Sequence, residues 1–230
     1  MLNLLACGVP VAKCEILDGS AIDAFNKYSP EVDDMPISPH LFVELQDCTS
    51  EGLEAQEGLV TSILSEAGAD DGSTSFSSDP SKSKKLWAAR HATYYASCAL
   101  RPDAKGLVTD ACVPLSALAG VIRATAEDVA ESGVVGPVFG HAGDGNFHCI
   151  LPLREDDDEE YVRRVEGLNE RLIKRTLEAG GTCTGEHGVG SGKVGYLEEQ
   201  YGAATVEVMR TIKRSLDPKN ILNPDKVLTL

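Results

Sequence analysis

Two histidines that flank a tight turn are the strongest sign of chemistry in this chain. Segment 140–148 reads Gly-His-Ala-Gly-Asp-Gly-Asn-Phe-His and contains two of the five histidines. Asp-Gly at the centre of a two-residue loop favours a β-hairpin, because both residues accept a positive φ. With Asp144 and Gly145 as that loop, His141 and His148 face each other directly, with Cβ atoms about 5 Å apart. This spacing is typical of metal ligands, although two structural histidines beside a turn would give the same pattern.

A second cluster supplies the ligand types that the hairpin lacks. The segment Gly185-Glu186-His187-Gly188 adds a carboxylate and a third imidazole. Two neutral imidazoles and one carboxylate form a three-ligand set that leaves coordination positions open for water or substrate. Zinc, manganese and iron all accept these ligands, so the residue types leave the metal open.

The glycine-rich segment 185–195 is similar to two kinds of nucleotide-binding loop and satisfies neither. A P-loop requires Gly where His187 stands and Ser or Thr where Val194 stands. Three glycines within 190–195 have the spacing of a dinucleotide fingerprint, but no apolar strand leads into them, which argues against NAD. We therefore interpret these glycines as places where the backbone approaches a bulky neighbour closely.

One arginine is a candidate for binding an anion. Helical spacing places Trp87, Arg90 and Tyr94 on one face of the segment 81–100. Arginine binds a carboxylate through two parallel hydrogen bonds. A surface ion pair is the alternative that spacing alone leaves open.

The composition limits the partners of this chain. It has 230 residues, of which 42% are hydrophobic, and a formal net charge of -15. Such an acidic chain repels nucleic acid and anionic lipid, so we expect neither as a partner. An anionic substrate would require a locally positive site, which a metal ion and an arginine would provide. No apolar run approaches the roughly 20 residues that span a bilayer, and no convincing signal or transit peptide opens the chain.

The seven cysteines form no Cys-x-x-Cys pair and stand among apolar neighbours. This usage predicts reduced, partly buried thiols in a reducing compartment.

The pattern of apolar residues predicts a mixed fold. We expect an α+β domain over residues 1–230, in which a mainly antiparallel sheet carries helices on one face. The expected strands lie at 11–18, 41–46 and 107–113 and in a hairpin within 134–153, and the expected helices begin near 21 and lie at 51–67, 81–100, 115–132, 155–179 and 205–216. The acidic run 155–160, at the start of the expected helix 155–179, fits a solvated helix N-terminus.

Together these segments resemble the C-terminal, substrate-side domain of FAD-linked 2-hydroxy-acid oxidoreductases, the D-lactate dehydrogenase and glycolate oxidase group. The resemblance covers nearly the whole chain, and the pair His-x-Gly-Asp-Gly-Asn-x-His and Glu-His-Gly-Val-Gly is its most specific part. Its carriers are the segments 11–18, 86–90, 110–114, 140–148, 185–190 and 217–224.

The resemblance implies a ferredoxin-like cap domain and a role for each candidate residue. His141, His148 and Glu186 match the ligands of a divalent metal, zinc or manganese, and Arg90 matches the arginine that holds the substrate carboxylate. His187 matches a residue beside substrate and flavin and is the candidate base. The implied reaction oxidises a small anionic D-2-hydroxy acid to a 2-oxo acid. In it the metal lowers the pKa of the hydroxyl, His187 accepts the proton, and a hydride passes to FAD.

The resemblance also implies where the flavin is held. Asn223, Gly188 and Gly190 match positions near the flavin, and the tail 217–230 is expected to pack toward it. In the relatives a flavin-binding domain precedes this region, and residues 1–230 contain no counterpart of it. We therefore expect this chain alone not to hold FAD tightly. An electron acceptor such as cytochrome c or a quinone, and a mitochondrial location, follow from the family only.

One position separates the expected substrates. Members that act on D-2-hydroxyglutarate tend to carry Asn two residues after the second histidine, where this chain has Ile150. An apolar wall suits a short side chain, so we favour D-lactate over D-2-hydroxyglutarate or glycolate. A non-enzymatic fragment or assembly module, and a metal hydrolase built on the same ligands, are the alternatives of other classes.

Overall fold

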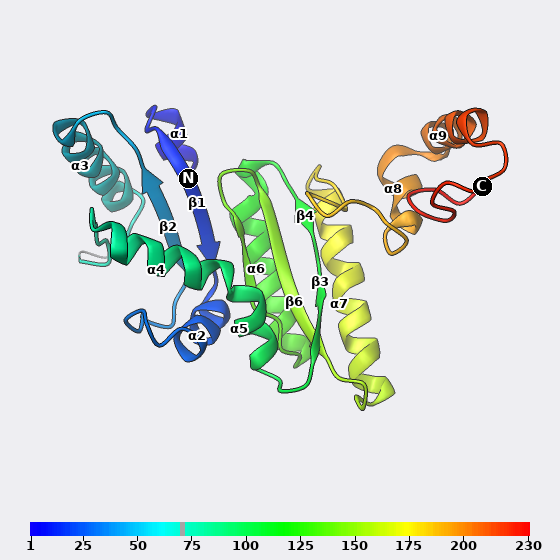
Figure 1. The fold of residues 1–230 in the computed structure, drawn as a ribbon, viewed down its shortest axis with the longest axis horizontal. Coiled ribbons are helices and arrows are strands. Elements are labelled where there is room, and N and C mark those ends of the chain that lie inside the picture. The colour runs from blue at the N-terminus through cyan, green and yellow to red at the C-terminus, as the bar shows by residue number, and fades with distance from the viewer. Residues whose placement is uncertain (70–71) are drawn as a thin grey trace.

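The chain folds around an antiparallel sheet, and the α+β class expected from the sequence is confirmed. The computed structural model describes residues 1–69 and 72–230, in which the sheet has six strands in the order β2-β1-β5-β6-β3, with β4 also paired to β6 (Figure 1). The strands are β1 (Val11–Leu17), β2 (His40–Leu45), β3 (Lys105–Val108), β4 (Ala111–Cys112), β5 (Val138–His141) and β6 (Asn146–Leu153).

The helices account for most of the remaining chain. They are α1 (Leu2–Ala6), α2 (Gly19–Tyr28), α3 (Ser50–Glu66), α4 (Pro80–His91), α5 (Thr93–Ala99), α6 (Leu115–Ser132), α7 (Glu159–Glu178), the 3-10 turn η1 (Val194–Tyr196), α8 (Leu197–Tyr201) and α9 (Ala203–Leu216). None of the helices in the described residues has the length and hydropathy needed to cross a membrane.

Alternation along β6 divides the core into two layers. Phe147, Cys149 and Leu151 point toward one cluster, whereas Ile150 belongs to the other. Successive side chains of a strand point to opposite faces, so one strand serves both layers. Burying a large apolar side chain contributes about 1.5–3 kcal/mol, which makes this central strand a major source of stability.

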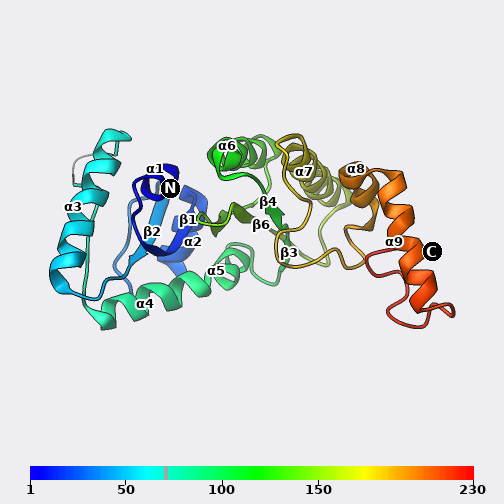
Figure 2. The ribbon, with the colours of Figure 1, turned by 90° about the horizontal axis from the view of Figure 1, so that it is seen from above.

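Helices cover both faces of the sheet, which differs from the expected arrangement on one face. Side chains of α6 and α7 pack on the Phe147 side, and side chains of α2 and α4 pack on the Ile150 side. Figure 2 shows α6 and α7 above the strands and α4 and α5 below them. The central strand β6 is buried at nearly every position because both of its faces are covered.

The hairpin forms, but its register differs from the prediction. His141 pairs with Asn146, and His148 pairs with Phe139. The turn is therefore longer than two residues, and the amides of Asp144 and Gly145 both donate to the carbonyl of His141. His148 therefore lies opposite Phe139, two positions along β5 from its predicted partner His141. Since side chains alternate with a period of two, both histidines stay on the same face, as diagonal neighbours.

Two predicted elements are interrupted where charged residues enter the interior. The expected helix 81–100 breaks at Ala92 into α4 and α5. The expected strand 107–113 separates into β3 and β4 on either side of Thr109 and Asp110. The break in the helix leaves Arg90 in the last turn of α4, buried at the face of the sheet.

The cysteines are free thiols, as the sequence predicts. All seven lie in the described residues, and three of them, Cys14, Cys149 and Cys183, are buried. Burial raises the pKa of Cys14 to about 11. Such thiols remain protonated and unreactive at neutral pH.

Asp18→Asn is expected to stabilise the protein at pH 7 and to change little near pH 4. Asp18 caps α2 by accepting from the amide of Ala21 at 2.7 Å, and burial raises the pKa of its carboxyl to about 6. An unfolded aspartate titrates near pH 3.9. The folded state therefore binds more protons between these two values, and wild-type stability falls as pH rises through them. Asparagine keeps the cap without the buried charge, so we expect a gain of about 1–3 kcal/mol at pH 7 by urea denaturation.

The matched control is Asp79→Asn at the exposed cap of α4, where the carboxylate accepts from the amide of Ser81 at 2.8 Å. Its effect on the free energy of unfolding should be similar at both pH values. Parallel pH profiles for Asp18→Asn and wild type would contradict the assignment.

Candidate metal and anion site

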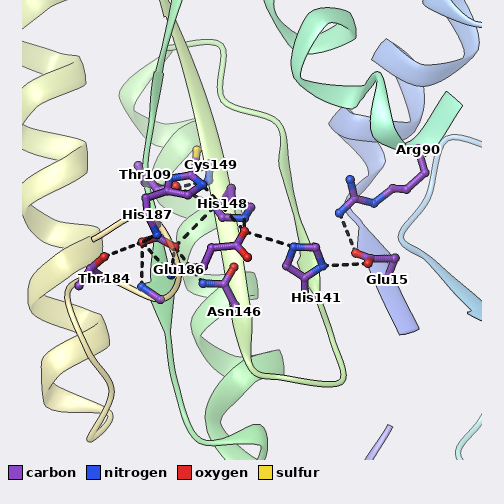
Figure 3. Close-up of polar contacts among 12 residues, drawn as sticks. Glu15, Arg90, Thr109, His141, Asn146, His148, Cys149, Thr184, Glu186 and His187 are labelled. Carbon is purple, nitrogen blue, oxygen red and sulfur yellow. Dashed lines mark hydrogen bonds and ion pairs between the residues drawn. The ribbon is translucent and has the colours of Figure 1, made fainter. Parts of the chain in front are cut away.

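Strand pairing brings the polar residues of the site into one row. Glu15 of β1 lies opposite His141 of β5, and His141 lies opposite Asn146 of β6. His148 stands in the next row of β6, on the same face. The row belongs to the face of the sheet that also carries α2, α4 and α5, and Figure 3 shows it in close-up. Residues far apart in sequence therefore become neighbours through the sheet.

The structure brings together the three expected metal ligands. Nε2 of His141 lies 3.4 Å from Oε1 of Glu186, and Nε2 of His148 lies 3.3 Å from the same oxygen. The two rings meet nearly at right angles, with centroids 5.9 Å apart. One ligand atom from each residue lies within 4.8 Å of the others, which is close enough for one cation to contact all three.

Each histidine is oriented by its second nitrogen. Nδ1 of His148 donates to the carbonyl of Thr109 at 3.0 Å, and Nδ1 of His141 donates to Glu15 at 2.8 Å. Both acceptors lack a proton, so each Nδ1 carries one, and in the neutral ring each Nε2 presents its lone pair to Glu186. This arrangement of ligand and outer acceptor is the usual one at histidine metal sites.

The environments shift the pKa values of these groups in different directions. The hydrogen bond to Glu15 raises the pKa of His141, whereas burial lowers the pKa of His148. Burial alone would raise the pKa of Glu15, but hydrogen bonds and charge from His141 and Arg90 outweigh it and hold that pKa below its usual value. Glu15 is therefore an anion at neutral pH, and His148 is a neutral imidazole.

Asp110 organises the loop that carries Glu186 and His187. Its carboxylate is almost fully buried, with 2% of the residue exposed. Hydrogen-bond donors surround it and keep its pKa well below the usual range despite burial. These donors are Nδ2 of Asn146 (2.9 Å), Oγ1 of Thr184 (2.8 Å), the backbone amides of Gly185 (2.8 Å), Glu186 (3.2 Å) and His187 (3.0 Å), and Nζ of Lys193 (3.2 Å).

A close approach at Gly185 completes this packing. A Cβ there would lie 1.6 Å from Nδ2 of Asn146, so only glycine allows the loop to reach β6. Glu15 and Asp110 lie in the segments 11–18 and 110–114 that carry the family resemblance, and the sequence predicts no role for either of them. A charged residue inside the expected apolar strand 107–113 is the signal that the sequence offers for Asp110.

Arg90 is a buried cation rather than a surface one. It donates to Oε2 of Glu15 at 2.7 Å, and its guanidinium lies 4.8 Å from the centre of the Phe139 ring. Its Nε is buried and has no hydrogen-bond partner among the described residues. A buried donor without a partner is costly, and an anionic ligand would satisfy it.

A small cavity connects Arg90 to the histidines. Its volume is about 260 Å³, and it is lined by Arg90, Tyr94, Val108, Phe139, His141, His148, Ile150 and His187. Arg90 and Tyr94 share it, as helical spacing predicted, whereas Trp87 lies outside and packs under the ammonium of Lys13. The His187 ring stacks on His148 with centroids 4.9 Å apart. The lining combines one cation, imidazoles and an apolar wall, a pattern that suits a small organic anion.

The residues expected near a flavin lie on the exposed side of the glycine-rich loop and tail. Gly188 and Gly190 have φ of 81° and 54°, and nothing lies within 4 Å of a Cβ built at either. The amide of Val227 donates to the carbonyl of Gly190 at 2.7 Å, which ties the tail to the loop. Asn223 is an exposed residue of this tail with φ of 47°. The bulky neighbour expected for these glycines is not among the described residues.

Comparisons with known proteins give a consistent result. Residues 2–227 match the family model described as FAD linked oxidases, C-terminal domain. The chain is 42% identical over 229 residues to a probable mitochondrial D-lactate dehydrogenase of Danio rerio, which covers 100% of this chain and 45% of that protein. It is 36% identical over 222 residues to a mitochondrial D-lactate dehydrogenase (cytochrome) of Arabidopsis thaliana, which covers 96% of this chain and 38% of that protein. The chain therefore spans less than half the length of these relatives.

A solved structure shares the fold. The match to 4-ethylphenol oxidase from Gulosibacter chungangensis, in an isoeugenol complex, has a TM-score of 0.61 and 14% sequence identity. It covers 94% of this chain and 47% of that chain. At this identity the similarity concerns the fold alone.

Asp110→Asn is expected to loosen the loop at 184–187 and to lower stability. An amide keeps one acceptor oxygen and turns a second donor toward the backbone amides, so several buried donors lose their partner. We expect a loss of about 2–4 kcal/mol in the free energy of unfolding, and amide exchange at 185–187 at least tenfold faster. Urea denaturation and hydrogen exchange measure the two effects.

Asp128→Asn is the matched control. Asp128 of α6 is likewise a carboxylate with several donors, but these come from Arg171 and Arg175 of α7 and not from the loop. Its replacement should destabilise the protein without selectively speeding exchange at 185–187. Equal exchange of this loop in both variants would refute the organising role of Asp110.

Proposed function

Because the chain belongs to the family of FAD-linked oxidase C-terminal domains, we propose that it supplies the substrate and metal site of a flavoenzyme. The proposed reaction is the oxidation of a small D-2-hydroxy acid, with D-lactate favoured, to the 2-oxo acid. The observation that carries this proposal is that a buried arginine, His141 and His148 line one cavity of about 260 Å³. Glu186 completes the three-ligand set at 3.3–3.4 Å from both histidines. A 2-hydroxy acid carries a carboxylate and a hydroxyl on adjacent carbons, so its binding requires an arginine for the carboxylate and a metal site for the hydroxyl next to each other.

A divalent metal fits the residues present. Two Nε2 lone pairs face one carboxylate oxygen at 3.3–3.4 Å, and lone pairs held this close repel unless a cation or a proton lies between them. Oδ1 of Asn146, beside this cluster, is also buried without a partner among the described residues. We propose that His141, His148 and Glu186 hold zinc or manganese. When bound, such a metal lowers the pKa of a coordinated hydroxyl.

The remaining residues of the cavity bind and orient the substrate. Arg90 holds the carboxylate through charge-assisted hydrogen bonds, which its unpartnered Nε favours. His187 has its ring at the cavity and takes the hydroxyl proton on an imidazole nitrogen. Ile150, Val108 and Phe139 form a wall without a polar group. A second carboxylate, as in D-2-hydroxyglutarate, would be desolvated there without a partner, so a short aliphatic acid is favoured.

FAD would accept the hydride when bound, and most of its contacts are proposed to lie outside these 230 residues. Gly188, Gly190 and Asn223 are proposed to face it, with the tail 217–230 toward it. Support comes from their exposure and from the open space at both glycines. A mitochondrial location is proposed because both relatives are named mitochondrial. A cytochrome is proposed as electron acceptor because the name of the Arabidopsis thaliana relative includes that word, and a quinone is the other acceptor that the family resemblance implies.

His148→Ala is expected to abolish tight metal binding. The wild-type chain, freed of metal and titrated with Zn²⁺ in a calorimeter, should bind one equivalent. Loss of one of three protein ligands should weaken binding at least tenfold, since even outer partners of metal ligands contribute 10–100-fold. His40→Ala is the control, because His40 of β2 bonds to the carbonyl of Ser38 and lies outside the cluster. Undiminished zinc in His148→Ala would remove the ligand assignment.

Arg90→Met is expected to lower the efficiency of D-lactate oxidation. The chain joined to the flavin-binding half of a related D-lactate dehydrogenase should show flavin bleaching by D-lactate but not by L-lactate. Losing a charge-assisted hydrogen bond removes about 1.5–3 kcal/mol, which lowers kcat/KM about 10- to 100-fold. Arg163→Met on the exposed side of α7 is the control. A non-enzymatic module would give no bleaching with any 2-hydroxy acid, and a metal hydrolase would act without flavin.

A further inference from the structure

We infer that Glu15 is a positioning residue that holds the metal ligand His141 and the anion-binding Arg90 with one carboxylate. This inference rests on the proposed function of the cavity and deepens it. Glu15 does not line the cavity, so it acts only through the two residues that it contacts. It is 75 residues from Arg90 and 126 residues from His141 in sequence.

The geometry gives each carboxylate oxygen a separate task. Oε1 lies 2.8 Å from Nδ1 of His141, and Oε2 lies 2.7 Å from a terminal nitrogen of Arg90. The Glu15 side chain is only 14% exposed, and strand pairing places its backbone directly opposite His141. Figure 3 shows the carboxylate between the imidazole and the guanidinium. A carboxylate that is shielded from solvent and accepts two short hydrogen bonds fixes both partners more firmly than a solvated carboxylate does.

On the side of His141, Glu15 selects the tautomer. A carboxylate only accepts, and the contact from Nδ1 to Glu15 (2.8 Å) is shorter than the contact from Nε2 to Glu186 (3.4 Å), so the proton of the neutral ring lies on Nδ1. Nε2 is then left as the lone pair that faces Glu186 at 3.4 Å. The other tautomer would place a proton on Nε2 and remove this nitrogen as a ligand. The metal ligand set is thus complete only while Glu15 is an acceptor for His141.

On the side of Arg90, Glu15 fixes the direction of the guanidinium. It occupies one terminal nitrogen, while the plane is supported by the Phe139 ring at 4.8 Å. Nε is left without a partner among the described residues. Because the guanidinium fork is rigid, fixing one nitrogen fixes the directions of the others. The anion and the metal are therefore aligned by the same carboxylate, which sets the relation between substrate carboxylate and hydroxyl.

Two substitutions separate these tasks. In Glu15→Gln, the single amide oxygen is expected to stay with the charged Arg90, and the amide NH₂ then donates to Nδ1 of His141. The imidazole proton moves to Nε2, so affinity for Zn²⁺ should fall 10- to 100-fold while the affinity of the metal-free protein for D-lactate changes less than threefold. Glu15→Ala removes both contacts and should weaken both Zn²⁺ and D-lactate binding about tenfold or more. A merely structural role would not produce this division.

The experiment combines calorimetry with imidazole ¹⁵N spectra of the metal-free chain at about pH 9, well above the ordinary pKa of histidine. Wild type should show His141 with its proton on Nδ1, and Glu15→Gln should show it on Nε2. Glu44→Gln is the matched control, because Glu44 of the neighbouring strand β2 is bonded to Lys13 and Gln46. This variant should match wild type in both affinities and in the His141 spectrum.

The outcomes distinguish this inference from the proposed function. If wild type binds Zn²⁺ but Glu15→Gln binds it within twofold and keeps the Nδ1 proton, the inference is overturned and the metal site stands. If wild type binds no Zn²⁺, the metal site fails, while the imidazole spectra still decide whether Glu15 sets the tautomer. A wild-type His141 with its proton on Nε2 would overturn the inference without any variant, so misfolding of a variant cannot protect it.

Discussion

The burial of the Asp110 carboxylate is the constraint on which the site depends. A carboxylate taken out of water without partners costs several kcal/mol, so it must gather donors. In this fold the donors come from β6 and from the backbone of the loop at 184–187. That loop has little apolar material of its own to bury. The carboxylate therefore holds Glu186 and His187 against the sheet, and the glycine at 185 permits the contact.

The site carries a local positive charge, whereas the chain as a whole is negatively charged. The net charge is -15, yet the cavity has a buried arginine at one end. Glu15 neutralises part of this cation and leaves its Nε without a partner among the described residues. An arginine held in this way binds an anion with little reorganisation, because its position is fixed before the ligand arrives. The exposed acidic residues elsewhere on the surface have little influence on the electrostatic potential at the buried Arg90, since exposed charges are screened over about 10 Å.

The sequence predicted the parts of the site that local pattern specifies. The hairpin, its two histidines and the helix that carries Arg90 follow from turn residues and apolar spacing, and the structure brings His141, His148 and Glu186 together. Local pattern did not predict the register, in which His141 pairs with Asn146 and the turn is longer than two residues. Gly145 of this turn lies against the carbonyl of Val113, a tertiary contact that turn residues alone do not reveal. A shift of one residue would have separated the histidines, whereas a shift of two kept them on one face.

Glu15 and Asp110, for which the sequence predicts no role, act across long sequence separations, and the signals at Asp110 and at Arg90 include interruptions of regular structure. Glu15 meets its partners only after β1 pairs with β5, and nothing in the segment 11–17 marks it out from a solvated strand residue. Asp110 lies where the strand at 107–113 is interrupted, and Arg90 lies beside the break between α4 and α5. In both places regular structure ends in the interior, where unpaired backbone groups are costly. A fold tolerates such interruptions when side chains with charge replace the missing contacts, so the breaks in the predicted elements mark the site as clearly as its histidines do.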